Sequence, residues 1–404
     1  MRKSVKQSYI PSTVVLQLIE TFRQMTNDCI RVGLRENVST LKRLSSLSYG
    51  ELRRYDDVPS YYKLCAISRA AGILSSRKKS LRRGHLTRSP YTSRPVLVSC
   101  YGFKIAASRL LIPIGDREYE SIPLNARTTQ TLSDSTLSVR SFTLTDRSLS
   151  LCVSREVKEV EVSETRGAMG IDRNLRNITV GNARQVTYYD ISKAVSIFEN
   201  TRSIISSFKR NDSRIRKGIA SKYGRRRRER TRRILHWVSK DIVQNAKSNR
   251  QTIIFEEIRG IRKLYRKGNW QGRKQRGRMN SWTFHELKRQ VEYKATWEGV
   301  PVITLTRSET KGTTMDCPRC GERLQSAARG DMKHYRQMWC GECKRWEDRD
   351  LCAVLNISRR GWVRFAQSKG EAGEAVKGNA EHDREPPILR VDASKPGNRC
   401  QPKT

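Results

Sequence analysis

Three acidic residues stand in separate short motifs of a chain that is otherwise strongly basic. Asp172 lies within Gly-Ile-Asp-Arg-Asn, Glu256 ends the apolar run Ile-Ile-Phe, and Asp350 opens an apolar stretch after a cysteine-rich segment. Carboxylate oxygens suit magnesium or manganese, and two such ions about 3.5–4 Å apart neutralise a phosphodiester and activate water. These residue types and positions predict a metal-dependent site for phosphodiester hydrolysis at Asp172, Glu256 and Asp350.

Each acid also has an ordinary structural explanation. Asp172 alone is typical of a turn, and Glu256 alone is typical of a strand end at the surface. Asp350 is typical of a first helical turn, where a carboxylate interacts favourably with the helix dipole. The order along the chain, two acids, then paired cysteines, then a third acid, favours the catalytic interpretation. Glu257 and Asp348 are expected neighbours of this site without an assigned role.

Two pairs of cysteines have the spacing of a zinc site. Nineteen residues separate Cys317-Pro-Arg-Cys320 from Cys340-Gly-Glu-Cys343. This spacing predicts tetrahedral zinc, with each turn completed by the Gly or Lys that follows. Four thiolates leave no open coordination position, so we expect a structural ion. The start of the chain lacks an apolar signal region, which predicts a reducing compartment. The remaining cysteines are therefore expected to be free thiols: Cys29, Cys65, Cys100, Cys152, Cys352 and Cys400.

The charge balance predicts a polyanionic partner. The 404 residues include 81 Lys or Arg and 40 Asp or Glu, a formal net charge of +41. Nucleic acid supplies the missing counter-charge, and the release of its condensed cations drives binding. An anionic membrane surface is the alternative. No basic amphipathic stretch stands out, and no apolar run approaches 18 residues, so a membrane span is excluded.

Two basic runs are candidates for nucleic-acid contact. Seven arginines fall within 225–233, and 259–278 carries nine Lys or Arg and no acid. A solvated helix face is the ordinary explanation of such a run. In the second run, the absence of acids and the interleaved aromatic residues favour phosphate contact with base stacking. The second run follows Glu256 and is a candidate mobile lid. The candidate contacts are Arg225, Arg226, Arg227, Arg228, Tyr265, Trp270, Arg273, Lys274, Arg276 and Arg278.

The apolar pattern changes twice along the chain. Apolar residues recur at helical spacing from about residue 13 to 88. Short β-like runs separated by turn residues follow from Pro95 to about Glu164 and predict a small barrel. Strands that alternate with helices begin at Gly167 and predict an α/β unit, which positions the acids. The strands expected in this unit are 169–171, 177–181, 185–190, 252–255 and 300–306.

The motifs around the acids and cysteines carry a family resemblance. GIDRN resembles the first RuvC motif, and IIFEE resembles the second. CPRCG…CGECKRWEDRDLCAVLNI resembles a zinc ribbon that leads into the third. The chain therefore resembles the TnpB family, transposon-encoded RNA-guided nucleases related to compact type V CRISPR effectors. The layout is similar over roughly residues 1–365, and the specific motifs lie between 167 and 360.

Three positions depart from the family pattern. Asn174 stands where Gly is common, and Asn tolerates a left-handed backbone. Glu257 stands where Asp is usual. Cys352 replaces an Asn two residues after the third acid, which predicts weaker hydrogen-bond support for Asp350.

The resemblance implies a multidomain α+β protein. An RNase H-like (RuvC) α/β domain contains an inserted zinc ribbon and follows a small β-barrel, the wedge, that carries a helical recognition insert. Residues 366–404 contain seven Lys or Arg and six Asp or Glu without a periodic apolar face, which predicts a disordered tail. The expected boundaries are 1–12 and 89–165 for the barrel, 13–88 for the insert, 166–312 and 344–365 for the RuvC-like domain, and 313–343 for the ribbon.

The resemblance also implies an activity, RNA-guided DNA cleavage beside a short flanking motif that the wedge and the insert recognise. The implied cofactors are magnesium (or manganese), zinc and a guide RNA, and the implied target is double-stranded DNA. A prokaryotic, cytoplasmic and nucleoid-associated protein is implied, and the oligomeric state is open. The alternatives are a nuclease-inactive RNA-guided repressor, a compact CRISPR-associated effector, and a structural zinc-ribbon RNA-binding protein, in which the acids have no purpose.

Overall fold

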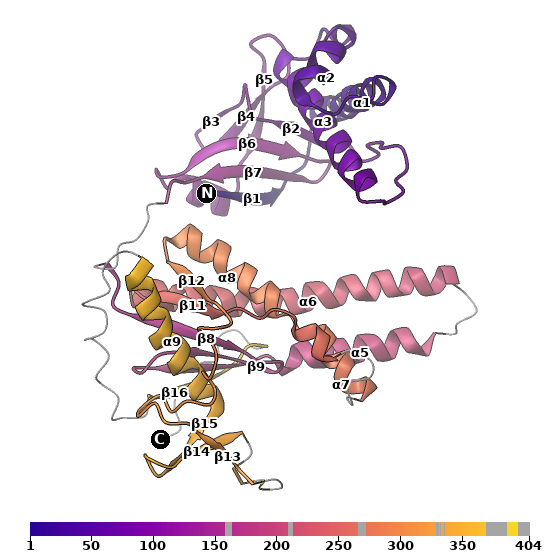
Figure 1. Ribbon diagram of the computed structural model, residues 1–404. Coiled ribbons are helices and arrows are strands. Elements are labelled where there is room, and N and C mark those ends of the chain that lie inside the picture. Colours follow the sequence, from indigo (N-terminus) through magenta and orange to yellow (C-terminus); the bar gives the residue numbers. More distant parts are fainter. Residues whose placement is uncertain are drawn as a thin grey trace. The chain divides into compact units, whose positions relative to one another are not determined.

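The computed structural model describes residues 1–157, 164–208, 213–265, 272–328, 331, 333–334, 336–368 and 386–394, with the side chains of 214–216, 262 and 264 excepted. The chain divides into two compact units, Met1–Glu156 and Val157–Thr404 (Figure 1).

The first unit contains the expected helical segment. Helix α1 begins after Ser12, whose side chain accepts a hydrogen bond from the backbone N–H of Val15. Its buried face, which includes Phe22 and Met25, packs against α3. The helices, with one short 3-10 turn, are α1 (Thr13–Arg35), α2 (Leu41–Ser48), η1 (Glu51–Arg54), α3 (Ser60–Arg82) and α4 (Ala126–Leu132).

The strands of the first unit form two antiparallel sheets. One has the order β1-β7-β6-β2, and the other has the order β3-β4-β5. Because the strands are divided over two sheets, the predicted barrel stays a prediction. Residues 1–12 were assigned to the barrel without a predicted strand, and all seven residues of β1 pair with β7. The bounds are β1 (Arg2–Ser8), β2 (Leu97–Ser99), β3 (Lys104–Ala106), β4 (Arg109–Pro113), β5 (Tyr119–Pro123), β6 (Ser138–Leu144) and β7 (Ser148–Ser154).

A mixed sheet of six strands forms the centre of the second unit. Its order is β12-β11-β8-β9-β10-β16. Strand β11 runs parallel to both β8 and β12, whereas β9 runs antiparallel to β8 and β10. The expected α/β unit is therefore present. The bounds are β8 (Ala168–Arg173), β9 (Asn177–Gly181), β10 (Val186–Asp190), β11 (Thr252–Glu256), β12 (Val302–Leu305) and β16 (Ile388–Asp392).

Helices cover both faces of this sheet. Successive side chains of a strand point to opposite faces, so each strand contributes apolar residues to both helical layers. Ile171 and Ile253 share one apolar cluster with residues of α6 (Ser213–Ser248) and α8 (Phe284–Glu298). Ile254 packs on the opposite face against α9 (Arg349–Ser368). A Cβ at Gly170 would lie 2.4 Å from the carbonyl oxygen of Val354, so glycine permits the close approach of α9 to β8.

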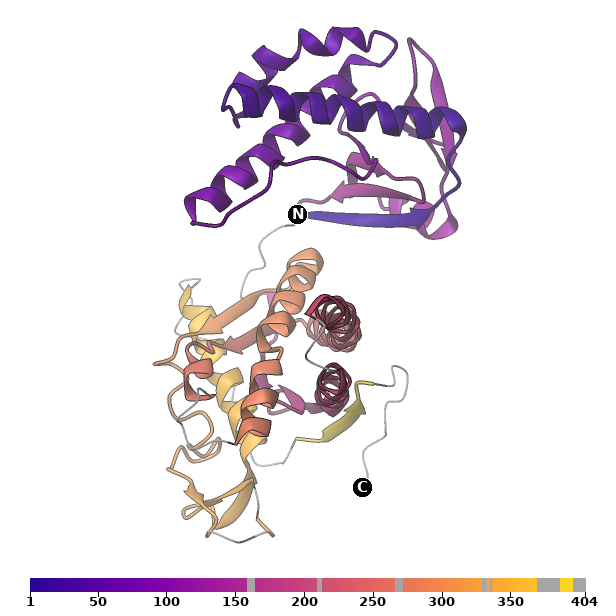
Figure 2. The same ribbon diagram turned by 90° about the vertical axis from the view of Figure 1, so that its right-hand side faces the viewer.

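A helical hairpin extends from the sheet. Helices α5 (Ser192–Ser207) and α6 lie side by side in both views (Figures 1 and 2). The second basic run contains the 3-10 turn η3 (Ile261–Tyr265) and the helix α7 (Arg273–Ser281), with 266–271 outside the described residues. A mobile lid at this run therefore stays a prediction.

Part of the predicted disordered tail is ordered. Helix α9 continues to Ser368, and Ile388–Asp392 forms β16, which pairs in parallel with β10. The prediction of disorder is therefore wrong for these residues, because Val391 is buried against the core and backbone pairing completes the sheet edge. Residues 369–385 and 395–404 lie outside the described residues.

Candidate functional site

The fold brings the three acids to one end of the central sheet. Asp172 and Glu256 lie two residues beyond Gly170 and Ile254, so all four residues face α9. Phe255 is paired with Ile171, so the acids that follow them sit at the same level on adjacent parallel strands. Asp350 lies in the first turn of α9.

A single cavity of about 770 Å³ is lined by all three acids. Its wall also contains basic side chains, including Arg307, Arg336 and Arg349, together with Trp282. The cavity is therefore lined by both acids and cations, and the cations suit a substrate that carries phosphate groups.

Burial raises the pKa of two of the three acids, and charge repulsion adds to this effect at Asp172. The pKa of Asp172 is raised from 3.8 to about 7, first by burial and then by the negative charges of Glu256 and Asp350. Burial also raises the pKa of Glu256, and the neighbouring Arg173 partly opposes this shift. A cation bound between Asp172 and Glu256 would lower the pKa of both side chains.

Asp350 is held at both of its carboxylate oxygens. The side-chain amide of Asn177 donates to Oδ2 at 3.0 Å, and Arg336 donates to Oδ1 at 2.5 Å. Arg336 has a left-handed backbone with φ of 71°. The guanidinium therefore lies where a cation bound to Asp350 would compete with it.

Arg173 connects the two strand ends with α8. Its guanidinium donates to the carbonyl oxygens of Glu256 at 2.5 Å and Phe284 at 3.1 Å. The side chain is buried, its Nε makes no hydrogen bond within the described residues, and the guanidinium lies over the ring of Phe255 at 5.1 Å. Arg173 thereby fixes the backbone from which Glu256 projects.

The neighbours of the acids behave differently from the sequence expectations. Asn174 does not have a positive φ, and instead its amide donates to Oδ2 of Asp172 at 2.8 Å.

Cys352 is buried among ribbon residues such as Met338, away from the hydrogen bonds that hold Asp350. The hydrogen bonds described for Asp350 come from Asn177 and Arg336, and the predicted weakening of Asp350 by Cys352 stays a prediction. Asp348 caps α9 by accepting from the backbone N–H of Asp350 and Leu351. Glu257 pairs with Arg259 at 2.6 Å.

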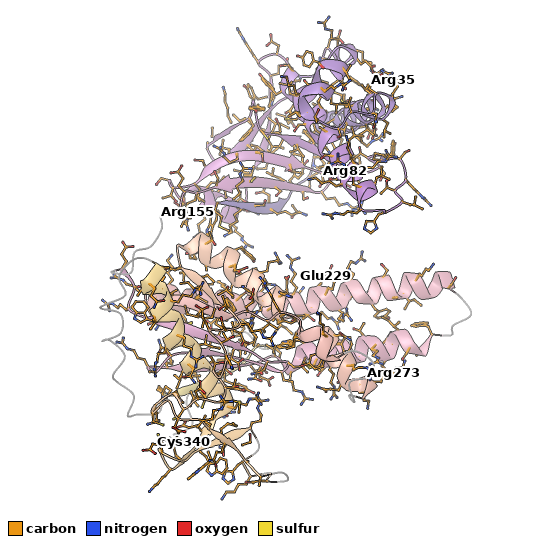
Figure 3. The ribbon with its side chains drawn as sticks, in the orientation of Figure 1. Arg35, Arg82, Arg155, Glu229, Arg273 and Cys340 are labelled. Atoms are coloured by element: carbon orange, nitrogen blue, oxygen red, sulfur yellow. The ribbon has the colours of Figure 1, made fainter. Side chains whose placement is uncertain are left out.

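The cysteine cluster adjoins a small three-stranded sheet, in which one of the four cysteines, Cys340, ends a strand (Figure 3). All four Sγ atoms lie within 4.8 Å of one another, with Cys320 and Cys340 at 3.5 Å and Cys317 and Cys343 at 3.9 Å. Tetrahedral zinc requires sulfur atoms roughly 3.8 Å apart. The sheet consists of β13 (Gln325–Ser326), β14 (Gln337–Cys340) and β15 (Arg345–Asp348).

The backbone of each cysteine pair turns as the sequence predicts. Gly321 and Lys344, which follow the two pairs, have φ of 81° and 48°. The donor set of four thiolates can hold zinc. Within the described ranges, no other group of three or more potential ligands is as close together, so the three carboxylates are more widely spaced than the thiolates.

The first basic run lies along α6. Arg225, Arg227 and Arg228 line a cavity of about 740 Å³ between α6 and the start of α8. Two of the arginines stack over rings, Arg226 over Tyr223 and Arg227 over Phe198. These contacts leave the guanidinium edges available for phosphate.

Only part of the second basic run is free to contact nucleic acid. Arg278 pairs with Glu199 of α5 at 2.6 Å, so this arginine joins two helices. Arg273, labelled in Figure 3, is exposed at the start of α7, and so is Lys274. Arg276 and Tyr265 are half-buried, and Trp270 lies outside the described residues.

Sequence reasoning missed Arg173, Asn177 and Arg336 as residues of the site. Asn177 carried a weak signal, because it is a polar residue that opens the otherwise apolar run Ile-Thr-Val. Arg336 carried none, because its contact with Asp350 depends on how the ribbon folds back.

Each helix in the described part of the chain is too short or too polar to cross a membrane.

The chain is similar in sequence to known proteins. A family model described as Cas12f1-like, TNB domain matches residues 284–357. The TnpB-like protein MJ0751 of Methanocaldococcus jannaschii is 30% identical over 201 residues, which are 48% of this chain and 68% of that protein.

Two solved structures are similar at low sequence identity. The Cas12f1-sgRNA-target DNA complex matches with a TM-score of 0.36 and 15% identity, over 89% of this chain and 99% of that one. The mini-RNA-guided endonuclease CRISPR-Cas_phi3 matches with a TM-score of 0.46 and 10% identity, over 94% and 93%.

Proposed function

Because the chain belongs to the TnpB-like protein family, we propose that it is an RNA-guided DNA endonuclease of the RuvC type. The observation that carries this proposal is the convergence of Asp172, Glu256 and Asp350 on one cavity from two strands and a helix. The order of the six-stranded sheet, with helices on both faces, supports an RNase H-like domain.

The acids fit divalent cations. Asp172 has a pKa of about 7 because it is buried next to two further carboxylates, and such a group binds a hard cation in place of its proton. Asp172, Glu256 and Asp350 would hold magnesium or manganese, which when bound supplies charge neutralisation at the phosphate and an activated water.

The surrounding residues prepare this site. Arg173 holds the end of β11, and Asn177 orients Asp350. Asn174 donates to Asp172 and leaves its other oxygen available. Arg336 neutralises Asp350, and this guanidinium must move from Oδ1 or share it when a cation binds. Once displaced, it lies beside the cavity, where it can pair with a phosphate oxygen.

The rest of the chain would hold the nucleic acids. In this proposal a guide RNA pairs with one DNA strand, and the wedge-like barrel with its helical insert recognises a short flanking motif. The arginines along α6 and the exposed cations Arg273 and Lys274 contact the phosphate backbone. The source would be a mobile element in a prokaryote, with the protein associated with the nucleoid.

The decisive experiment compares the wild-type chain with Asp172→Ala. Each protein is purified with its RNA, and that RNA is sequenced to identify the guide. A plasmid that carries the matching target is then incubated with magnesium. We expect the wild type to linearise the plasmid and Asp172→Ala to lose at least about a hundredfold in rate while it retains the RNA. Undiminished cutting by the variant would remove the metal assignment.

A nuclease-inactive repressor is the second candidate. The ion pair between Arg336 and Asp350 favours it, because this contact occupies one of the oxygens that a catalytic metal requires. A repressor would bind the matched plasmid with guide-dependent affinity and leave it supercoiled at every magnesium concentration.

A further inference from the structure

A second polar cavity lies at the opposite end of the same two parallel strands. It has a volume of about 360 Å³ and is lined from three segments. Arg166 precedes β8, Arg184 lies in the turn between β9 and β10, and Arg250 joins α6 to β11. The carboxylate cavity is at the carboxyl ends of β8 and β11, so this one, at their amino ends, is a separate site.

The lining of this cavity, which we name the three-arginine cavity, is cationic without counter-charge. No Asp or Glu contributes to its wall. Within the described residues, the side chains of Arg166, Arg184 and Arg250 make no hydrogen bond or ion pair, and all three residues are exposed. The hydroxyl of Tyr189, which also lines the cavity, donates to Asp241 at 2.7 Å. Three guanidinium groups over one cavity repel one another, which an anionic ligand would relieve.

The backbone that carries these arginines is fixed. The N–H of Arg166 donates to the carbonyl oxygen of Arg250 at 2.7 Å, which joins two of the segments. Asn182 holds the third, because its amide donates to Ala168 while its oxygen accepts from the N–H of Arg184 at 2.9 Å. The cavity is therefore preorganised, which lowers the entropic cost of binding.

Amide side chains complete the lining. Those of Gln185 and Gln251 make no hydrogen bond within the described residues and face a cavity that Asn245 and Asn249 also line. Amides can both donate and accept, and this suits base edges and sugar hydroxyls. The side chains of Met169 and Tyr189 provide apolar surface beneath them.

We propose that the three-arginine cavity binds one phosphate-linked nucleotide of a single-stranded nucleic acid. The arginines would hold the phosphate and the amides would contact the base or sugar. A volume of about 360 Å³ fits one nucleotide rather than a duplex. The inference rests on the proposed function, since the strand would be the guide RNA or the displaced DNA, and it adds an anchoring point on the sheet that also carries the acids.

The test measures binding of a short oligouridylate and the matching deoxyoligomer to the full chain without added magnesium. Fluorescence anisotropy is recorded over a range of salt concentrations for wild type, Arg184→Gln and the double variant with Arg250→Gln. Each lost phosphate contact is expected to reduce the salt slope by about 0.7 and the affinity by about tenfold. Arg359→Gln, an exposed arginine of α9 outside the cavity, is the matched control.

The two oligomers distinguish the source of the ligand. A loss confined to the oligouridylate assigns the cavity to RNA, and an equal loss for both assigns it to the backbone of either strand. An oligouridylate carrying photoreactive 4-thiouridine is then cross-linked, and we expect modified peptides from 166–169 or 182–187. These variants change exposed residues, and unchanged melting temperatures verify that they fold.

The inference is overturned if Arg184→Gln and the double variant bind as Arg359→Gln does. That result leaves the proposed function intact, because guided cleavage of the plasmid is measured separately. A wild-type chain that binds neither oligomer contradicts the proposed function as well, and the two failures are thereby told apart.

Discussion

The cysteine cluster and the carboxylate cavity are both candidate metal sites, but they are built in different ways. Four thiolates come from two tight turns within one stretch of 27 residues, 317–343, and lie within 4.8 Å. Three carboxylates come from β8, β11 and α9, and they line a cavity of about 770 Å³ with basic residues between them. Local sequence is sufficient for the first site, whereas the second exists only when the sheet and α9 pack. A closed cluster suits a structural ion, and a wide, mutually repelling set suits ions that share their shell with a substrate.

The largest expected effect follows removal of zinc. Cys320→Ser should lose the ion and unfold the ribbon, because structural zinc contributes about 10–16 kcal/mol in small zinc-binding peptides. Zinc content by mass spectrometry and proteolysis of the ribbon measure this. Cys100→Ser, at an exposed cysteine outside the cluster, is the control.

The same variant tests whether the two sites are independent. The ribbon leads directly into β15, the cap Asp348 and the acid Asp350. We therefore expect Cys320→Ser to abolish cleavage too. Full cleavage by the zinc-free variant would show that the carboxylate cavity does not need the ribbon.

The second prediction tests the packing of α9 on the central sheet. Gly170→Ala places a Cβ 2.4 Å from the carbonyl oxygen of Val354, a backbone atom that cannot rotate away. We expect a loss of about 1–3 kcal/mol in the free energy of unfolding, with reduced cleavage because Asp350 moves from its partners. Urea denaturation measures the loss. Gly218→Ala is the control, because nothing lies within 4 Å of its added Cβ; equal stability of the two variants would contradict the close contact.

The third prediction tests whether Arg173 supports one acid of the carboxylate cavity, Glu256. Arg173→Gln removes the charge that lowers the pKa of Glu256 and a hydrogen bond to its carbonyl oxygen. We expect cleavage to fall by about 10–100-fold. The acidic limb of the pH–rate profile should also move to higher pH. Arg176→Gln, at an exposed arginine, should leave both unchanged. A lower rate with an unmoved pH profile would limit Arg173 to a structural role.

The smallest effect concerns protonation of Asp172. Its pKa is about 7 in the folded chain against an ordinary 3.8, so the folded state binds the proton more tightly. The stability from this group is complete below about 3.8 and is lost as the pH rises towards 7. Without added magnesium, Asp172→Asn should therefore melt a few degrees above wild type at pH 8, with a smaller difference at pH 5. Asp57→Asn, at an exposed residue, is the control, and a difference independent of pH would contradict the assignment.

Much of this architecture could be predicted because it depends on local patterns. The strands at 169–171, 177–181 and 252–255 have runs of apolar residues, and β8, β9 and β11 contain them. The cysteine spacing predicted the cluster. The resemblance to the TnpB family is confirmed by the relative with 30% identity.

Other features depend on contacts between distant residues and left no periodic signal. In β1 only Gln7 is buried, so the alternation that identifies a strand is absent, and its pairing with β7 forms it. The same applies to β16 within the polar tail. Arg336 meets Asp350 only after the ribbon folds back, and spacing alone could not predict this ion pair.

Strand β16 has a practical consequence for anyone who shortens or fuses this protein. It covers the open side of β10, residue by residue from Val186 to Asp190. A truncation after α9 would leave the amide and carbonyl groups of β10 unpaired, and an exposed strand of this kind recruits other chains. Shortened versions should therefore aggregate although every residue of the carboxylate cavity is retained.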